Sequence, residues 1–194
     1  MAPVLPRDDG ILDSRVHNTF AGAPSFTLRH RVVRALFGVV WFILARWTPP
    51  PMHRWRVFLL NLFGARVSPT ARVYGSARIW YPKNLSMAAQ SVLGPGVICY
   101  CMAKISIGER AIVSQRAHLC AGSHHVDDEH FQLFAEPISI GSNAWVAAEA
   151  FVGPGVTIGQ GAVLGARGVA AKNLSDWTIY VGNPARPLRE RKRF

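Results

Sequence analysis

An aliphatic or small apolar residue returns at nearly every sixth position from Val67 to Leu174. Two runs keep this step without a break, and their units begin at Ile140, Val146, Val152, Ile158 and Leu164, and at Ile107, Val113 and Leu119. A step of six fits neither an α-helix, with a period of about 3.6, nor a simple sheet, with a period of about 2. It is typical of a parallel β-helix in which each hexapeptide lays one short strand and one corner on a prism. The sequence therefore predicts an all-β main domain wound as a coil of hexapeptides.

The six-residue step is interrupted at three places. Extra pairs of residues at Leu85–Ser86 and Ile105–Ser106 shift its phase. The longest interruption, residues 125–137, is polar and aromatic and cannot continue the step. A loop that leaves a regular scaffold is a common position for functional residues. We therefore predict a coil over residues 65–177 with a functional loop at 125–137.

Two helices are predicted before the coil, in a region covering residues 26–64. The first extends from about Thr27, as its cap, to Trp47, and the three prolines after Thr48 end it. The second extends from about Met52 to Phe63, and Gly64 follows it at the C′ position. Its apolar residues form a stripe at helical spacing, namely Trp55, Phe58, Leu59 and Leu62.

The helical region has two interpretations that do not exclude each other. It can cover one open end of the coil, whose strand edges would otherwise remain unpaired. It can also act as a basic, apolar anchor that gives residues 28–47 a peripheral contact with a membrane surface. The interpretation as a cap is favoured, because stacks of repeats need terminal covers.

The two ends of the chain lack the six-residue step. Residues 1–25 are predicted to be an extended arm that is ordered only if it docks, and residues 178–194 a basic tail. The N-terminus has no secretory signal pattern. The longest apolar run, Ala35–Ala45, is about half of the ~20 residues that a membrane span requires. Three cysteines without a C-x-x-C motif are expected to be reduced thiols. Together these features predict a cytoplasmic protein.

The chain is strongly basic, with 22 Lys and Arg against 11 Asp and Glu and a formal net charge of +11. This charge is compatible either with an arginine-rich surface or with a partner that carries phosphates. Nucleic acid is a poor candidate, because the basic residues are scattered and no nucleic-acid-binding motif is present.

Several segments resemble the left-handed β-helix (hexapeptide) acyltransferases. They are the repeat itself, the LCAGSHH segment at Leu119–His125 before the loop, and the NPAR segment that begins at Asn183. The helical prefix and the YPKNLSM segment that begins at Tyr81 are similar to the colanic acid biosynthesis acetyltransferases. The resemblance implies a left-handed coil, acetyl-CoA as acyl donor, a saccharide hydroxyl as acceptor, and a homotrimer. It implies no metal.

The resemblance assigns the general base to His124, because a histidine at the start of such a loop removes the proton of the acceptor hydroxyl. An imidazole near neutral pKa suits this step, since an alcohol is a poor nucleophile until it loses its proton. A backbone N–H near the coil corner would stabilise the oxyanion. This chain has His125 where the family commonly has an acid, so Asp127 or Asp128 replaces that acid, or none is needed.

The resemblance also assigns residues to the coenzyme. Ala147 and Ala148 match a small pair that leaves room for pantetheine, and Ala166 matches an alanine whose backbone contacts it. Lys172 and Arg186 match basic residues near the coenzyme phosphates, which is the expected chemistry for a phosphorylated nucleotide. Two interpretations of Trp145 remain open: it can flank the coenzyme groove, or it can pack against a neighbouring subunit.

Two other functions remain as alternatives. Trimeric β-helix carbonic anhydrases hold zinc with three histidines across a subunit boundary, and here His125 and His130 with His118 or His124 have a plausible spacing. The coil can also be a non-catalytic scaffold. A covalent mechanism through Cys120 is disfavoured, because packing is the expected role of a small apolar residue beside the coil.

Overall fold

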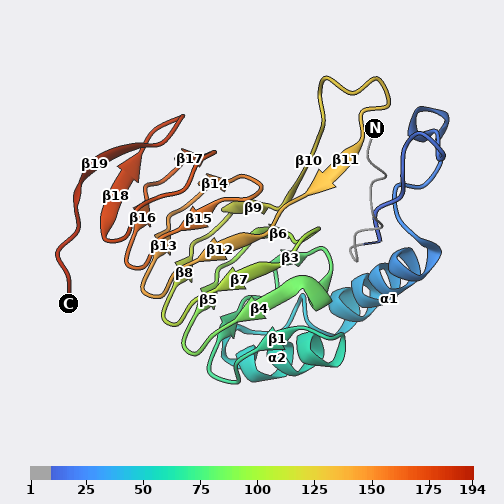
Figure 1. Ribbon diagram of the computed structural model, residues 1–194. Coiled ribbons are helices and arrows are strands. Elements are labelled where there is room, and N and C mark those ends of the chain that lie inside the picture. The colour runs from blue at the N-terminus through green and yellow to red at the C-terminus, as the bar shows by residue number, and fades with distance from the viewer. Residues whose placement is uncertain (1–9) are drawn as a thin grey trace.

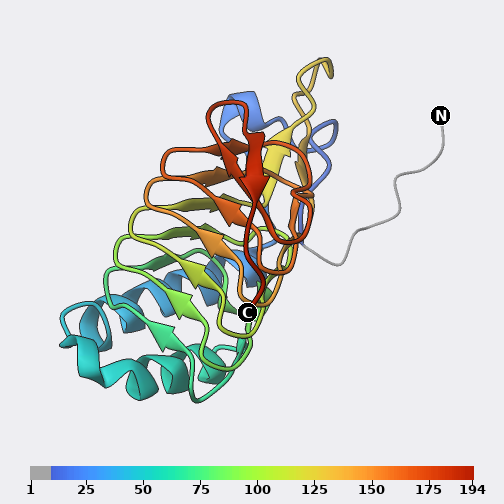
Figure 2. The same cartoon turned by 90° about the vertical axis from the view of Figure 1, so that its left-hand side faces the viewer.

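The computed structural model describes residues 10–194, which form a triangular coil of parallel strands with two helices at its N-terminal end (Figure 1). Successive coils lie one above another, and a single arm leaves the stack at one edge (Figure 2). The main domain is therefore the predicted β-helix.

Three faces carry the strands in repeating order. The first face contains β1 (Arg66–Val67), β4 (Leu85–Met87), β7 (Ile105–Ile107), β12 (Ile138–Ile140) and β15 (Thr157–Ile158). The second face contains β2 (Arg72–Val73), β5 (Val92–Leu93), β8 (Ile112–Val113), β13 (Trp145–Val146), β16 (Val163–Leu164), β18 (Thr178–Val181) and, at its edge, β19 (Arg186–Glu190). The third face contains β3 (Arg78–Ile79), β6 (Ile98–Tyr100), β9 (His118–Cys120), β14 (Phe151–Val152) and β17 (Val169–Ala170).

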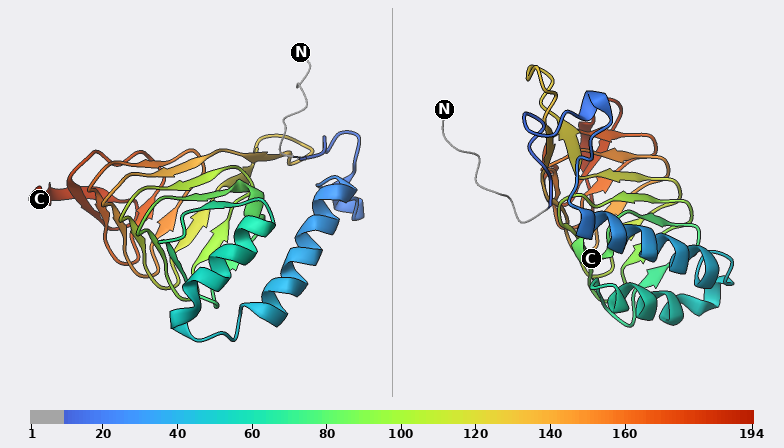
Figure 3. Two further views of the ribbon diagram at one scale, coloured as in Figure 1. Left: turned by 90° about the horizontal axis from the view of Figure 1, so that it is seen from below. Right: turned by 90° about the vertical axis from the view of Figure 1, so that its right-hand side faces the viewer.

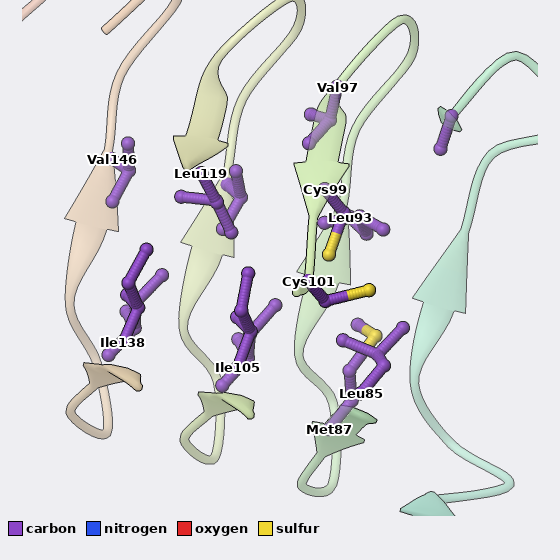
Figure 4. Packing of buried hydrophobic residues seen from close by; sticks show 14 of the residues in the cluster. Leu85, Met87, Leu93, Val97, Cys99, Cys101, Ile105, Leu119, Ile138 and Val146 are labelled. Carbon is purple, nitrogen blue, oxygen red and sulfur yellow. The ribbon is translucent and has the colours of Figure 1, made fainter. Parts of the chain in front are cut away.

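The apolar residues that set the six-residue step form the core of the coil. Val73, Val113, Val146 and Leu164 are fully buried on the second face. On the first face, Leu85, Ile105 and Ile138 pair in register, and Figure 4 shows them at the same place in successive coils. Side chains that stack on equivalent side chains remove most of the apolar surface of each coil from water.

The three corners of the coil differ in length. We call the turn from the first to the second face the first corner, the turn from the second to the third face the second corner, and the turn back to the first face the third corner. The first two corners keep the six-residue step throughout, as from Val67 to Val73 and on to Ile79. The third corner holds every interruption of the step that the sequence showed, including the segment between β9 and β12.

Two helices cover the N-terminal end of the coil, as Figure 3 shows. They are α1 (Leu28–Leu44) and α2 (His53–Leu62), so both predicted helices are confirmed with slightly shorter limits. Thr27 occupies the N-cap position of α1, but its side chain makes no capping hydrogen bond. None of the helices within residues 10–194 has the length and apolar content needed to cross a bilayer.

The apolar stripe predicted on α2 is divided between a buried and an exposed side of the helix. Leu59 is buried, whereas Phe58 and Leu62 are 56% and 68% exposed. The face that α2 turns to the coil instead includes Arg56, which is fully buried. Its guanidinium donates to the carbonyls of Val73, Thr48 and Pro50 and so ties the helix to the turn before it and to β2. A buried guanidinium needs such acceptors, and they fix which face of α2 packs inward.

The N-terminal segment packs back on the molecule between Gly10 and Thr27. Ile11 and Phe26 form an antiparallel bridge, and a short 3-10 helix, η1 (Thr19–Ala21), lies between them. Phe26 is buried against Trp80. The part of the predicted N-terminal arm before Gly10 lies outside the described residues.

The C-terminal segment is more regular than the predicted basic tail. β18 continues the second face in parallel with β16, and β19 folds back on β18 in antiparallel pairing. The repeat therefore extends one strand further than the sequence indicated, because Ile179 and Tyr180 continue the pairing on that face.

Candidate functional site

The segment predicted as a loop is a two-stranded arm that leaves the third corner. β10 (Gly122–His124) pairs antiparallel with β11 (Leu133–Ala135), and His124 lies opposite Leu133. Figure 1 shows this arm projecting from the coil beside the N-terminal segment. His124 therefore lies on an ordered element rather than on an irregular loop.

The imidazole of His124 is held in one orientation by Phe131. The two rings stack with centroids 4.3 Å apart and planes inclined by 14°. Nδ1 of His124 lies 2.7 Å from the Phe131 carbonyl oxygen. Because a carbonyl can only accept, Nδ1 must carry the proton, and in the neutral ring Nε2 is left with a free lone pair. The arm thus presents a nitrogen that can accept a proton.

Asp128 organises the tip of the arm. Its backbone carbonyl accepts from the N–H of Phe131, and its carboxylate accepts from the N–H of His130. Phe131 has a φ of +49°, which directs its carbonyl towards His124. Within residues 10–194 no hydrogen bond or ion pair joins Asp127 or Asp128 to His124. The partner of the His124 ring is therefore a carbonyl and not the acid that the sequence left open.

The arm rests on the insertions of the coils below it. Gly122 lies so close to Met102 that a Cβ there would collide with the sulfur. The segment around Met102 is held in turn by Asn84, whose amide donates to the carbonyls of Cys101 and Met102 at 3.1 and 2.7 Å. The segments that interrupt the six-residue step thus pack on one another, and together they support the base of the arm.

The N-terminal segment contacts the arm through Gln132. The Gln132 side-chain carbonyl accepts from the N–H and the hydroxyl of Ser14, at 2.7 and 2.8 Å. Its amide group donates to the Leu133 carbonyl at 2.8 Å and to the Leu12 carbonyl at 3.3 Å. The Gln132 backbone carbonyl accepts from the N–H of His125. Gln132 therefore connects a segment more than a hundred residues away to both strands of the arm.

The other histidines of this region lie against aromatic rings. His118 packs edge-on against Phe151 on the third face, and burial lowers its pKa. His125 stacks on Phe134 with centroids 4.7 Å apart. No three His, Cys, Asp or Glu side chains among residues 10–194 are grouped as a metal site. The zinc alternative therefore finds no ligand set in the described part of the chain.

The small residues assigned to pantetheine lie at the second corner. Ala147 and Ala148 follow β13, and Ala166 follows β16 one coil further on. The two turns are joined by the N–H of Arg167, which donates to the Ala148 carbonyl at 2.9 Å. Beside them Glu149 pairs with Arg116 at 3.0 Å and with Arg167 at 2.7 Å. The three alanines therefore share one edge of the prism.

The basic residues assigned to the phosphates lie elsewhere. Lys172 follows β17 at the third corner, two coils beyond the root of the arm, and Arg186 begins β19; both are exposed. Within one chain the structure thus groups the alanines with one another but separates them from His124 by the width of the third face. Trp145 projects from the second face, where its indole N–H donates to the Ser114 hydroxyl.

Sequence reasoning did not find Phe131, Gln132 or Ser14. Nothing in the six-residue step marks them, since they lie outside the coil. The apolar residues at alternating positions Phe131, Leu133 and Ala135 were the available signal for a strand there.

No family model matches the chain. WcaF of Escherichia coli (strain K12), which is named as a colanic acid biosynthesis acetyltransferase, is 42% identical over 145 residues, covering 75% of this chain and 80% of that protein. A maltose O-acetyltransferase from Clostridium difficile 630 has the same fold, with a TM-score of 0.76, 22% identity, and coverage of 86% and 90%. A hexapeptide-repeat acetyltransferase from Vibrio cholerae in complex with acetyl coenzyme A gives a TM-score of 0.74, 21% identity, and coverage of 86% and 91%.

Proposed function

The chain belongs to the family of the colanic acid biosynthesis acetyltransferases, and from that premise we propose that it moves an acetyl group from acetyl-CoA to a hydroxyl of a saccharide with His124 as general base. The observation that carries the role of His124 is the hydrogen bond from Nδ1 to the Phe131 carbonyl. It leaves Nε2 as the proton acceptor in the neutral ring.

In the proposed reaction Nε2 of His124 takes the proton of the acceptor hydroxyl as its oxygen attacks the thioester carbonyl carbon. The C–O bond forms, and the carbonyl electrons move to the oxyanion. When the tetrahedral intermediate collapses, the C–S bond breaks and the imidazolium returns its proton to the CoA sulfur. Positioned general base catalysis of this kind contributes roughly 10²–10⁴-fold to a rate.

We propose that the coenzyme lies along the second corner, against Ala147, Ala148 and Ala166. The support for this position is that Ala166 is exposed and Ala148 half-buried, and that neither carries a side chain that would fill the space beside the turn; Ala147 is buried. Lys172 and Arg186 are the proposed partners of its phosphates, since both are exposed cations. In one chain the three alanines lie at the second corner, whereas Lys172 and the arm with His124 lie at the third.

This separation supports the proposal of a homotrimer. If three coils stand side by side, the second corner of one chain can face the arm of the next, so that each site is completed across an interface. The proposal predicts that subunits without a neighbour are inactive even when they are folded. A cytoplasmic location, with peripheral contact between residues 28–47 and the inner face of the membrane, is part of the same proposal.

A thiol-release assay tests the proposed activity. Purified protein is incubated with acetyl-CoA and a panel of sugars and sugar nucleotides, and free CoA thiol and acetylated product are measured. We expect acceptor-dependent release with at least one saccharide, and a mass increase of one acetyl ester that mild base removes. Release without an acetylated sugar would contradict the proposal.

Calorimetry with CoA separates the proposed enzyme from a non-catalytic scaffold. We expect saturable binding that weakens when Lys172 and Arg186 are both replaced by Gln. A protein that binds no CoA, or binds it equally well after both substitutions, would contradict the coenzyme site. Metal analysis addresses the zinc alternative, since stoichiometric zinc in active protein would favour it.

A further inference from the structure

The solvent-facing side of α1 is apolar along its whole length. Leu28, Val32, Leu36, Val39 and Ile43 recur at helical spacing and are between 54% and 71% exposed. The opposite side carries His30, Phe37 and Trp41, which are buried against the rest of the molecule. A helix on the surface of a globular protein ordinarily turns a polar side to water, and a helix that is apolar on all sides has a second apolar partner.

The apolar surface continues beyond α1. Phe42 and Trp47 are 63% and 73% exposed near the end of the helix, and Phe58 and Leu62 lie on the outer side of α2. Trp55 connects the two helices, because its indole N–H donates to the Leu44 carbonyl at 2.8 Å and its ring stacks on Phe58. We call this surface, formed by Leu28, Val32, Leu36, Val39, Phe42, Ile43, Trp47, Trp55, Phe58 and Leu62, the basal apolar face. Contiguous exposed apolar surfaces of this kind mark sites of interaction.

The charge around the basal apolar face has one sign. Exposed arginines on the two helices are Arg29, Arg31 and Arg54. Arg46, in the turn after α1, is also exposed, and its guanidinium lies 5.8 Å from the Phe42 ring centroid. The chain contains no Asp or Glu between Asp13 and Glu109. The partner of this surface therefore meets an apolar stripe bordered by uncompensated positive charge.

From these observations we propose that the basal apolar face is a docking site for a lipid surface that carries anionic headgroups. The apolar side chains would enter the region between headgroups and acyl chains, and the arginines would remain at the level of the phosphates. Trp47 and Trp55 suit this depth, because tryptophan is enriched at the interface between a membrane and water. The proposal deepens the peripheral membrane contact proposed above by naming its surface and its lipid, and it does not depend on the proposed acetyl transfer.

The same features disfavour a second copy of the chain as the occupant. Two basal apolar faces placed together would bring their arginines into opposition, and like charges across an interface are repulsive. α1 is about 25 Å long at ~1.5 Å per residue and has one side buried in the protein, so it would lie along a membrane and not cross it.

Vesicle co-sedimentation of the full chain tests the proposal. The vesicles are phosphatidylcholine alone, or phosphatidylcholine with about one third phosphatidylglycerol. We expect binding to the anionic vesicles, much weaker binding to the neutral ones, and a strong decrease at about 0.5 M salt, where exposed charges are screened. Equal binding to both vesicles would overturn the assignment of anionic lipid.

A matched pair of double variants locates the contact. Val39→Asp with Ile43→Asp changes the basal apolar face, and Val16→Asp with Phe20→Asp places the same charge at residues that are 76% and 75% exposed in the N-terminal segment. We expect the first pair to lower the partition coefficient at least about tenfold and the second pair to lower it less than about twofold. Equal loss in both pairs would overturn the assignment to this face.

Folding and assembly are measured on the same variants without lipid. Circular dichroism that matches the unchanged protein excludes misfolding as the cause of lost binding. As a second variant that does not alter packing, Arg29→Gln with Arg31→Gln and Arg46→Gln is expected to weaken binding to anionic vesicles at least about tenfold. If the Asp variants change the oligomeric state in solution, the face is a protein interface and the lipid proposal is wrong.

Discussion

The second and third corners of the coil are built from the same repeat and serve different purposes. At the second corner every turn takes six residues, and each turn hydrogen-bonds to the turns beside it, as Arg167 does to Ala148. At the third corner two turns each contain an extra pair of residues, and the next turn contains the arm with His124. These insertions pack on one another and support the arm. A coil tolerates irregularity at one corner provided that the irregular segments pack on one another, because its core is set by the strands on the faces.

The largest expected effect concerns the arm. His124→Ala is expected to lower turnover several hundred-fold or more, because it removes the proposed base while the coil and its core remain intact. Turnover is measured by thiol release, and the unfolding midpoint by thermal melting. His125→Ala is the matched control: its ring stacks on Phe134 on the same arm, and it should cost less. Near-normal turnover of the His124 variant would remove it as base.

The regular corners should be intolerant of even one methyl group. A Cβ at Gly108 would lie 2.5 Å from the Ser142 backbone nitrogen, so Gly108→Ala is expected to lower the free energy of unfolding by about 1–3 kcal/mol. Gly153 occupies the equivalent position after a strand at the third corner, where the nearest atom would be 3.4 Å away. Gly153→Ala is expected to be nearly neutral. Chemical denaturation measures both, and equal losses would contradict the difference between the corners.

Gln132 tests whether the arm depends on the N-terminal segment. Gln132→Ala removes the hydrogen bonds to Ser14 and Leu12, so we expect kcat to fall by between about tenfold and a hundredfold through misplacement of His124. The unfolding midpoint should change little, since Gln132 is half-buried outside the core. Ser14→Ala removes only the hydrogen bond of the Ser14 hydroxyl and leaves that of its backbone N–H, so it should show a smaller decrease of the same kind. A variant with normal kcat but a lowered melting temperature would show a purely structural role.

The smallest effect concerns pH. Burial lowers the pKa of His118 below its ordinary value near 6.5, so the unfolded chain binds this proton more readily than the folded one. The contribution of the neutral His118 ring to the free energy of unfolding is therefore present at neutral pH. It is lost as the pH falls below about 6.5 and through the pKa of the folded state. We expect His118→Gln to flatten slightly the fall of the melting temperature between about pH 7 and pH 5. An unchanged or steeper slope would contradict this.

The candidate site was only partly accessible from the sequence. His124 and the alanines at the second corner were assigned by resemblance, and these assignments stay proposals. The tautomer of His124 could not be assigned, since it depends on the Phe131 carbonyl, and the direction of that carbonyl follows from the folded tip of the arm. The buried side of α2 could not be assigned from the sequence, because periodicity shows which residues align but not which side is covered.

The sequence by itself determined the coil, its core and its N-terminal helices. These features follow from patterns that are local in the sequence. Apolar residues at every sixth position are buried together in a β-helix, and prolines and glycines mark the helix ends. Only the tertiary structure decided which corner collects the insertions, how Gln132 joins Ser14 to the arm, and that α1 leaves an apolar side uncovered. Those features depend on contacts between segments far apart in the chain, and no local pattern of residues encodes such contacts.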